Sequence, residues 1–157
     1  MSKSGYKTLV LGLGNPILCD DSAGYQVAMS LKEKLDMPGV DIKEAGLAGL
    51  DFLDLITGYD RVIVIDAIQT EKGKPGNIYR FGPDSLTLTR HSSTTHNINI
   101  ATAIELGKKL KLKLPKEITI FAIEVEDVST FTEECTPVVK KAVPRCVTMV
   151  MRELRNA

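Results

Sequence analysis

Residues 61–66 have the sequence RVIVID, and this stretch decides the fold. Val and Ile fill the positions between an arginine and an aspartate. A short, nearly continuous run of β-branched residues is typical of a strand that is buried on both faces, as in a parallel sheet. Parallel strands are joined by crossover connections, so the chain on either side should alternate between helices and further strands.

The flanking sequence shows this alternation. Before RVIVID, Val27, Leu31 and Leu35 recur at the spacing of an amphipathic helix. After residue 68, a polar loop leads to a segment typical of an edge strand. We predict strands at Lys7–Leu13, Val40–Ala45, Asn77–Phe81 (an edge strand) and Ile118–Val125. We predict helices at Asp21–Leu35, Leu50–Ile56, about His96–Lys113 (with Ile104 and Leu106 inward) and from Thr132 onward, where Pro144 is a candidate kink. The expected fold class is α/β: one three-layer domain over residues 1–157, with a mostly parallel twisted sheet of about five strands flanked by helices.

Composition restricts the function. The chain has 20 Lys+Arg and 20 Asp+Glu, so it lacks the net basic charge expected of a protein that binds nucleic acid or an anionic membrane. Residues 1–7 lack the apolar core that a leader peptide would have, and no stretch reaches the roughly 18 apolar residues of a membrane span. Three cysteines without CxxC spacing indicate neither a disulfide framework nor a zinc knuckle. We therefore expect a reduced, cytoplasmic protein.

Polar residues gather where three predicted elements meet the carboxyl edge of the sheet, the usual ligand-binding edge of an open parallel sheet. Asp20 and Asp21 follow the first strand, Asp66 ends RVIVID, and His91 and His96 are the only two histidines. Two carboxylates and an imidazole can ligate a divalent transition metal. Alternatively, paired carboxylates can divide the roles of general acid and general base.

Each of these residues also has a purely structural interpretation. Asp20 or Asp21 stands where a helix N-cap is expected, Asp66 could hydrogen-bond the next loop, and His91 could face solvent. Cys19, beside the two aspartates, has no partner base nearby in the sequence, so we interpret it as a small buried side chain. It is the expected convergence of the three groups that favours a site.

Two other motifs are incomplete. GLGNPI at residues 12–17 begins like a dinucleotide fingerprint, but Ile17 stands where the third glycine is needed, and Glu44 lies too far along the chain for the ribose contact. LVLGLGNP also looks like the opening of peptidyl-tRNA hydrolase. That family continues with different residues where this chain has Cys-Asp-Asp, and a tRNA partner would favour a basic surface.

Five segments together resemble the hydrogenase maturation proteases, in order and over nearly the whole chain. They are GLGNPILCDDSAG (12–24), AGLAGLDFLDLITGYDRVIVIDA (45–67), STTHN (93–97), FAIEVEDV (121–128) and ECTPVVKKAVP (134–144). The resemblance implies an endopeptidase that removes a short C-terminal extension from the large-subunit precursor of a nickel–iron hydrogenase after nickel has been inserted.

The resemblance also implies roles for particular residues. Asp21, Asp66 and His96 match the family's metal-binding positions, which are thought to recognise nickel already present in the precursor. Glu44 matches an acidic position before the family's Gly-rich loop. This chain departs from the family pattern in three places: Ser22 replaces a usual glycine, Thr136 replaces a usual serine, and some members have Glu at the position of Asp21.

The hypothesis from the sequence is thus an aspartic-type endopeptidase with Asp21 and Asp66 as catalytic residues and Asp21, Asp66 and His96 as metal ligands. Nickel is supplied by the precursor, and neither an organic cofactor nor a resident zinc is expected. The partner is the hydrogenase large-subunit precursor, and we expect a monomer. Two alternatives stay open: a nickel-checking chaperone that does not cut, and a peptidase of similar fold that acts on an unrelated precursor.

Overall fold

A mixed sheet of five strands forms the centre of the computed structural model, which describes residues 5–46, 50–82 and 100–156. The strands are β1 (Thr8–Leu13), β2 (Val40–Ala45), β3 (Arg61–Ile68), β4 (Ile78–Phe81) and β5 (Glu117–Glu124), in the spatial order β2-β1-β3-β5-β4. The helices are α1 (Ala23–Lys34), α2 (Leu50–Ile56), α3 (Ile100–Lys109) and α4 (Pro137–Arg155), and a 3-10 turn at Cys19–Ser22 precedes α1. All strand pairs are parallel except β4–β5. The predicted α/β fold is confirmed.

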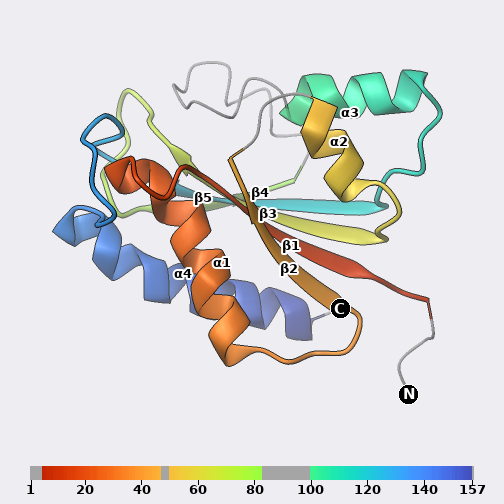
Figure 1. Ribbon diagram of the computed structural model, residues 1–157, viewed down its shortest axis with the longest axis horizontal. Coiled ribbons are helices and arrows are strands. Elements are labelled where there is room, and N and C mark those ends of the chain that lie inside the picture. Colours follow the sequence, from red (N-terminus) through yellow and green to blue (C-terminus); the bar gives the residue numbers. More distant parts are fainter. Residues whose placement is uncertain (1–4, 47–49, 83–99, 157) are drawn as a thin grey trace.

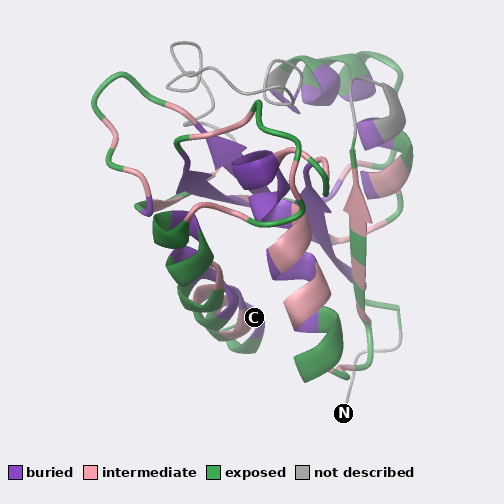
Figure 2. Cartoon of the chain, turned by 60° about the vertical axis from the view of Figure 1, so that its left-hand side comes forward, coloured by how far each residue is buried: buried purple, intermediate pink, exposed green. Residues whose placement is uncertain are grey.

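The helices form a layer on each side of the sheet, with α1 and α4 on one face and α2 and α3 on the other (Figure 1). Every residue of β3 is buried, because the strand is central and covered from both sides. Its side chains alternate between two cores: Ile63 and Ile65 pack on the α1/α4 side, and Val62 and Val64 on the α2/α3 side. Figure 2 shows the buried sheet between helices whose outer faces are exposed.

The elements differ from the prediction mainly at their ends. β3 continues two residues beyond Asp66, to Ile68. The first helix begins at Ala23, after the 3-10 turn, and the last begins at Pro137, because proline suits the first turn of a helix, where its missing N–H is not needed. The described part of the third helix is Ile100–Lys109.

Leu106 does not point inward as predicted. Its side chain is 36% exposed, whereas Ala103 and Ile104 are buried. Gly107 takes the next inward position, and a Cβ there would come within 2.9 Å of Leu114. The inward face of α3 therefore runs along residues 100, 103, 104 and 107, and it leaves residue 106 to one side.

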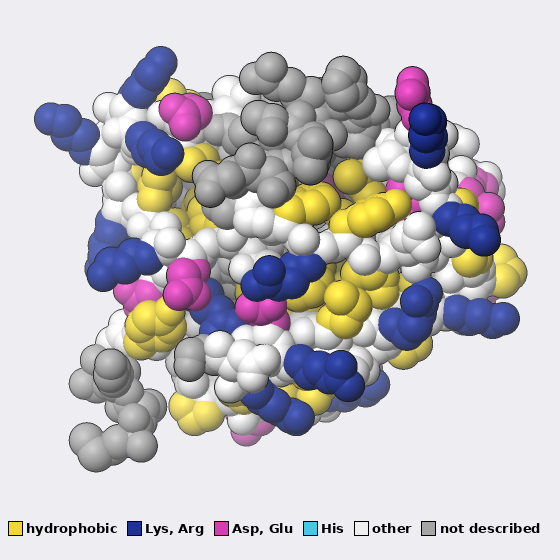
Figure 3. Space-filling view, turned by 180° about the vertical axis from the view of Figure 1, so that it is seen from behind, with side chains coloured by type: hydrophobic (Ala, Val, Ile, Leu, Met, Phe, Trp, Pro, Cys, Tyr) yellow, Lys and Arg dark blue, Asp and Glu magenta, His cyan; other side chains and the backbone are white. Residues whose placement is uncertain are grey.

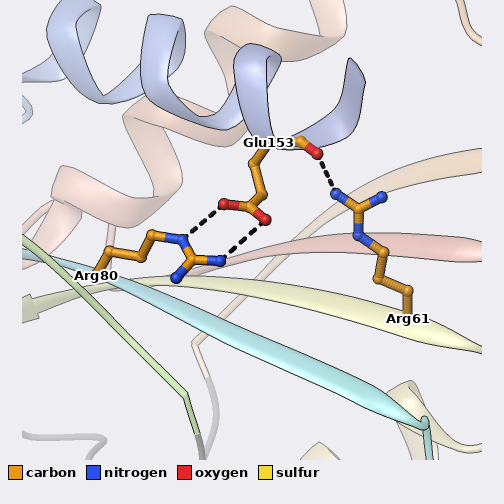
Figure 4. A network of polar contacts seen from close by, with 3 residues as sticks. All are labelled: Arg61, Arg80 and Glu153. Carbon is orange, nitrogen blue, oxygen red and sulfur yellow. Dashed lines mark hydrogen bonds and ion pairs between the residues drawn. The ribbon is translucent and has the colours of Figure 1, made fainter. Parts of the chain in front are cut away.

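The C-terminal end of α4 is fastened to the sheet through Glu153 (Figure 4). Arg80 of β4 donates from Nε to Oε1 of Glu153 at 2.6 Å and from a terminal nitrogen to Oε2 at 3.1 Å. Arg61, which is 3% exposed at the start of β3, donates to the Glu153 carbonyl oxygen. The Arg80 guanidinium lowers the pKa of the Glu153 carboxyl below its usual value.

Charged side chains are dispersed on the surface. On the face in Figure 3, Lys and Arg lie among Asp, Glu and exposed hydrophobic side chains and do not merge into one large basic area. This distribution matches the balanced charge of the sequence. Within the described parts of the chain, no helix combines the length and the apolar character needed to cross a membrane.

Candidate functional site at the carboxyl edge of the sheet

Asp66 lies near the carboxyl end of the central strand, and its side chain is 4% exposed. Alternation along β3 places it on the α2/α3 side of the sheet with Val62 and Val64. Its Oδ1 accepts a hydrogen bond from the Ala67 N–H at 2.8 Å. A carboxyl group is thus held between the apolar residues Ile65 and Ala67 of a buried strand, where a polar group is costly unless it is compensated.

Two glycines bring the 3-10 turn against this edge. A Cβ on Gly24 would overlap the carbonyl oxygens of Leu13 and Ile65, so the first turn of α1 rests directly on the ends of β1 and β3. Gly14 has φ +152°, and a Cβ there would overlap the carbonyl oxygen of Asp21. The glycines therefore let the turn carrying Asp21 approach the strand that carries Asp66.

Asp21 is 2% exposed within this turn. Its Oδ2 accepts a hydrogen bond from the Asn15 N–H at 3.1 Å, which closes the loop between β1 and the turn. The turn also contacts β3. The structure thus brings two buried carboxylates, from segments far apart in the sequence, to the same edge of the sheet.

The interpretation of Asp20 or Asp21 as the helix N-cap is wrong. Ser22 occupies the N-cap position of α1, and no side-chain capping bond is made there. The side chain of Asp20 is fully buried and points toward the loop after β5 and the start of α4. Its Oδ2 accepts the N–H groups of Glu126 and Asp127, each at 3.1 Å, and its Oδ1 accepts the Thr136 N–H at 2.7 Å.

Asp20 therefore fixes the position of the turn that carries Asp21. One carboxylate joins this turn to the loop after β5 and to Thr136, the residue just before α4. Charge-assisted hydrogen bonds to backbone N–H groups are stronger than neutral ones, and here they are shielded from water. The sequence offered no signal for this role, because the donors are backbone groups distant in the chain.

The departures from the family pattern are accommodated. Ser22 has φ −79°, a conformation open to any residue, and its hydroxyl donates to the Cys19 carbonyl oxygen at 2.7 Å. Thr136 keeps the hydroxyl of the usual serine, which lies 2.9 Å from Oδ2 of Asp20. Both residues therefore support the turn.

The cysteines are poor candidates for a nucleophile. Burial, and then the nearby Asp20 charge, raise the pKa of the Cys19 thiol. Burial also raises the pKa of Cys135, and it raises that of Cys146 to about 12. Because the thiolate is the reactive form, these environments make the thiols less reactive. The prediction of Cys19 as a small buried side chain is confirmed, since it is 4% exposed.

Two further glutamates lie near this edge. Glu44 of β2 pairs with Lys32 of α1 at 2.5 Å, and so has a partner on the α1 side of the sheet. Glu124, which the sequence analysis missed, ends β5 and is 2% exposed. Its carboxylate accepts the Thr70 N–H and hydroxyl, each at 2.7 Å, and the Tyr79 hydroxyl at 3.0 Å. The sequence signal that could have indicated this residue is a glutamate at the end of an apolar strand.

His91 and His96 lie outside the described residues, so their predicted roles stay predictions. Within residues 5–46, 50–82 and 100–156, no group of three or more His, Cys, Asp or Glu side chains could hold a metal ion. Asp21 and Asp66 would therefore need a further ligand from elsewhere in the chain or from the substrate.

The fold and the edge site define a single-domain α/β protein with two buried carboxylates at the carboxyl edge of its central strands. Comparison with known sequences then identifies the family. The chain belongs to the hydrogenase maturation protease family, whose HycI sequence profile matches residues 25–153. It is an endopeptidase, a hydrolase that acts on a peptide bond, and members of this family act on hydrogenase large-subunit precursors.

The relatives support this assignment over most of the chain. The Escherichia coli hydrogenase 2 maturation protease is 25% identical over 96% of this chain and 92% of its own length. A protein from Methanocaldococcus jannaschii, described as a putative hydrogenase maturation protease, is 33% identical over 59% of this chain and 62% of its own length. The structure of the hydrogenase-maturating endopeptidase HybD from E. coli has a TM-score of 0.84 at 25% identity, covering 96% of this chain and 93% of that one.

Proposed function

We propose that this endopeptidase removes the C-terminal extension of a nickel–iron hydrogenase large-subunit precursor after nickel insertion, and that it recognises the inserted nickel. Family membership supplies the reaction class. The observation that carries the finer proposal is the convergence of Asp21 and Asp66, two buried carboxylates, on the same edge of the sheet.

The chemistry of these side chains suits a nickel ion presented by the substrate. Carboxylate oxygens and an imidazole nitrogen are ordinary ligands for divalent first-row metals. In the proposal, Asp21, Asp66 and His96 provide such ligands, and the precursor provides the others. Because opposite charge stabilises a buried carboxylate, a cation arriving with the substrate would be attracted to this edge.

The same carboxylates are proposed as the catalytic residues. A carboxylate next to the scissile bond can accept a proton from the attacking water and later return one to the leaving amine. The turn that holds Asp21 is anchored by Asp20, so this carboxylate is kept in one place before the substrate binds. Nickel bound by the substrate would add positive charge beside the peptide carbonyl.

The test is to incubate the protein with nickel-loaded and nickel-free large-subunit precursor and to follow precursor mass by mass spectrometry. We expect loss of the tail only from the nickel-loaded form. Binding without a change of mass would instead support the chaperone alternative, and equal cleavage of both forms would refute nickel recognition.

Three variants test the proposed residues. Asp21→Asn, Asp66→Asn and His96→Ala should each reduce cleavage by at least about 100-fold, the usual contribution of an acid–base group. Asp36→Asn, an exposed aspartate at the end of α1, is the matched control for the carboxylates, and His91→Ala is the control for the imidazole. Normal cleavage by both Asp21→Asn and His96→Ala would show that the proposed site is wrong.

We also propose that the protein acts as a monomer in the cytoplasm. All three cysteines are free thiols, as expected in a reducing compartment. Light scattering after size-exclusion chromatography should give a mass near 17.2 kDa. A mass of twice that value would contradict the monomer, and fractionation of the source cells tests the location.

A further inference from the structure

A hollow of about 690 Å³ lies between the edge strand β4 and helix α4, and neither Asp21 nor Asp66 lines it. Asn77, Ile78 and Tyr79 form the strand side of the hollow. Arg145, Thr148 and Arg152 are among the residues of the helix side. Its volume is within the range of about 300–1,000 Å³ that is usual for ligand-binding sites.

The hollow runs along β4, which is the edge strand of the sheet within the described residues. β4 is the last strand in the order β2-β1-β3-β5-β4, and it pairs with β5 on one side. Ile78 packs against the core on the α1/α4 side. Tyr79, the next residue, therefore projects from the opposite face, where its hydroxyl donates to Glu124. A hollow lined by both residues must pass around the strand edge, where backbone N–H and C=O groups point outward.

Basic side chains line the helix side of this edge. Arg145 and Arg152 are exposed and seven residues apart, which places them on one face of α4 about 10.5 Å apart along its axis. In the described parts of the chain, neither has an acidic partner. Glu153, beside Arg152, is already bound by Arg80 through both carboxylate oxygens (Figure 4).

Arg145 is also oriented toward the strand. Its guanidinium donates to the carbonyl oxygen of Gly76, just before β4, at 2.8 Å. The guanidinium has further N–H groups beyond the one used in this bond. The hollow thus combines a strand edge with two arginines that have no acidic partner among the residues the structure describes. An edge strand recognises another peptide backbone, whereas a small anion would use only the charges.

We infer that the hollow is a groove that binds an extended acidic segment of the hydrogenase precursor by strand addition to β4. Two carboxylates of the segment would bind Arg145 and Arg152. Side chains alternate along an extended peptide, which rises about 3.3 Å per residue, so carboxylates four positions apart share a face and lie about 13 Å apart. The two long arginine side chains can reach this spacing from positions about 10.5 Å apart along α4. The source of the peptide rests on the proposed function. The groove would then hold the precursor at a second place, separate from the proposed catalytic residues.

Binding is tested first without cleavage, using fluorescence anisotropy of a fluorescein-labelled heptapeptide of sequence TEVTVET, whose glutamates share one face of a strand. The comparison peptides are TQVTVQT and a form of TEVTVET that is N-methylated at alternate backbone amides. The protein variants are Arg145→Gln/Arg152→Gln and, as a control with the same change of net charge, Lys109→Gln/Lys113→Gln. The lysines are exposed and lie at the end of α3 and just beyond it.

We expect the arginine variant to bind TEVTVET about tenfold or more weakly, because charge-assisted hydrogen bonds are lost. The lysine control should bind this peptide as tightly as the wild type does. Both comparison peptides should bind poorly to the wild type. Absence of binding to the wild type, equal binding by the arginine variant, or equal weakening by the lysine control overturns the inference. Equal binding of the N-methylated peptide overturns strand addition.

Precursor cleavage then tests the link to function. With nickel-loaded precursor, the arginine variant should show a KM raised by about tenfold and an unchanged kcat, because neither proposed catalytic residue lines the groove. An unchanged KM overturns the role of the groove in precursor binding. If the wild type does not cleave the precursor, the proposed function fails, and the peptide measurements still decide whether the groove binds acidic strands.

Discussion

Replacing Asp20 by Asn should destabilise the protein strongly, although the side chain keeps its size. The carboxylate accepts three backbone N–H groups: two on Oδ2, from Glu126 and Asp127, and one on Oδ1, from Thr136. An amide has only one oxygen. When the asparagine oxygen takes the place of Oδ2, the bonds from Glu126 and Asp127 are kept. The NH₂ group then takes the place of Oδ1 and faces the Thr136 N–H, so two donors face each other.

The magnitude follows from these contacts. Loss of the partner of a buried N–H costs about 1–3 kcal/mol. The two remaining bonds change from a charged to a neutral acceptor, which costs about 1 kcal/mol each. The free energy of unfolding should therefore fall by about 4 kcal/mol in total, a large share of the 5–15 kcal/mol typical of a domain.

Equilibrium unfolding in urea, followed by circular dichroism, measures this change. A lower midpoint with an unchanged slope is expected. Asp127→Asn is the matched control, since Asp127 also accepts bonds from Ser129 and Thr130 but lies at the surface. We expect a much smaller effect there. A loss below about 1 kcal/mol for Asp20→Asn would refute the view that Asp20 anchors the turn, since it is less than one buried bond should contribute.

Three other predictions concern packing, charge and thiols. Gly24→Ala places a methyl group against the backbone of β3, so it should lower the thermal midpoint and reduce cleavage; unchanged values would contradict the close approach. Glu153→Gln should destabilise the protein at neutral pH. Arg80 lowers the pKa of the Glu153 carboxyl, so its stabilising contribution is present above the usual value of 4.5 and is lost as pH falls through the lower folded value. The two proteins should converge in stability in acid, and a constant difference would argue against the pair. The folded protein should react slowly with iodoacetamide at pH 7, because its cysteine pKa values are raised; Cys135, the least buried, should react first as pH increases.

The sheet could be predicted from the sequence because its signals are local. RVIVID is buried on both faces, and such a run has few alternatives to a central strand. Val40–Ala45 and Leu50–Ile56 match the predicted ends, since turn residues border them. The position of Asp66 at the carboxyl edge followed from the strand alone.

The support of the site could not be predicted in the same way. Asp20 looks like an N-cap because an aspartate before a helix usually is one. Its actual partners are backbone N–H groups, which every residue has and which no pattern marks. Glu124 is similar, since its donors lie on Thr70 and Tyr79 of other segments. Tertiary hydrogen bonds of this kind need the fold before they can be assigned.

The anchoring of Asp20 has a consequence for the order in which the protein matures. Its backbone partners lie 106 to 116 residues further along the chain, so the turn made near the beginning is completed by segments made near the end. A growing polypeptide on the ribosome therefore carries Asp21 without its support until most of the sequence has emerged. Contacts of such long range also form late in folding. We expect an incomplete chain to be unable to cut, so that proteolytic activity appears only with the finished molecule.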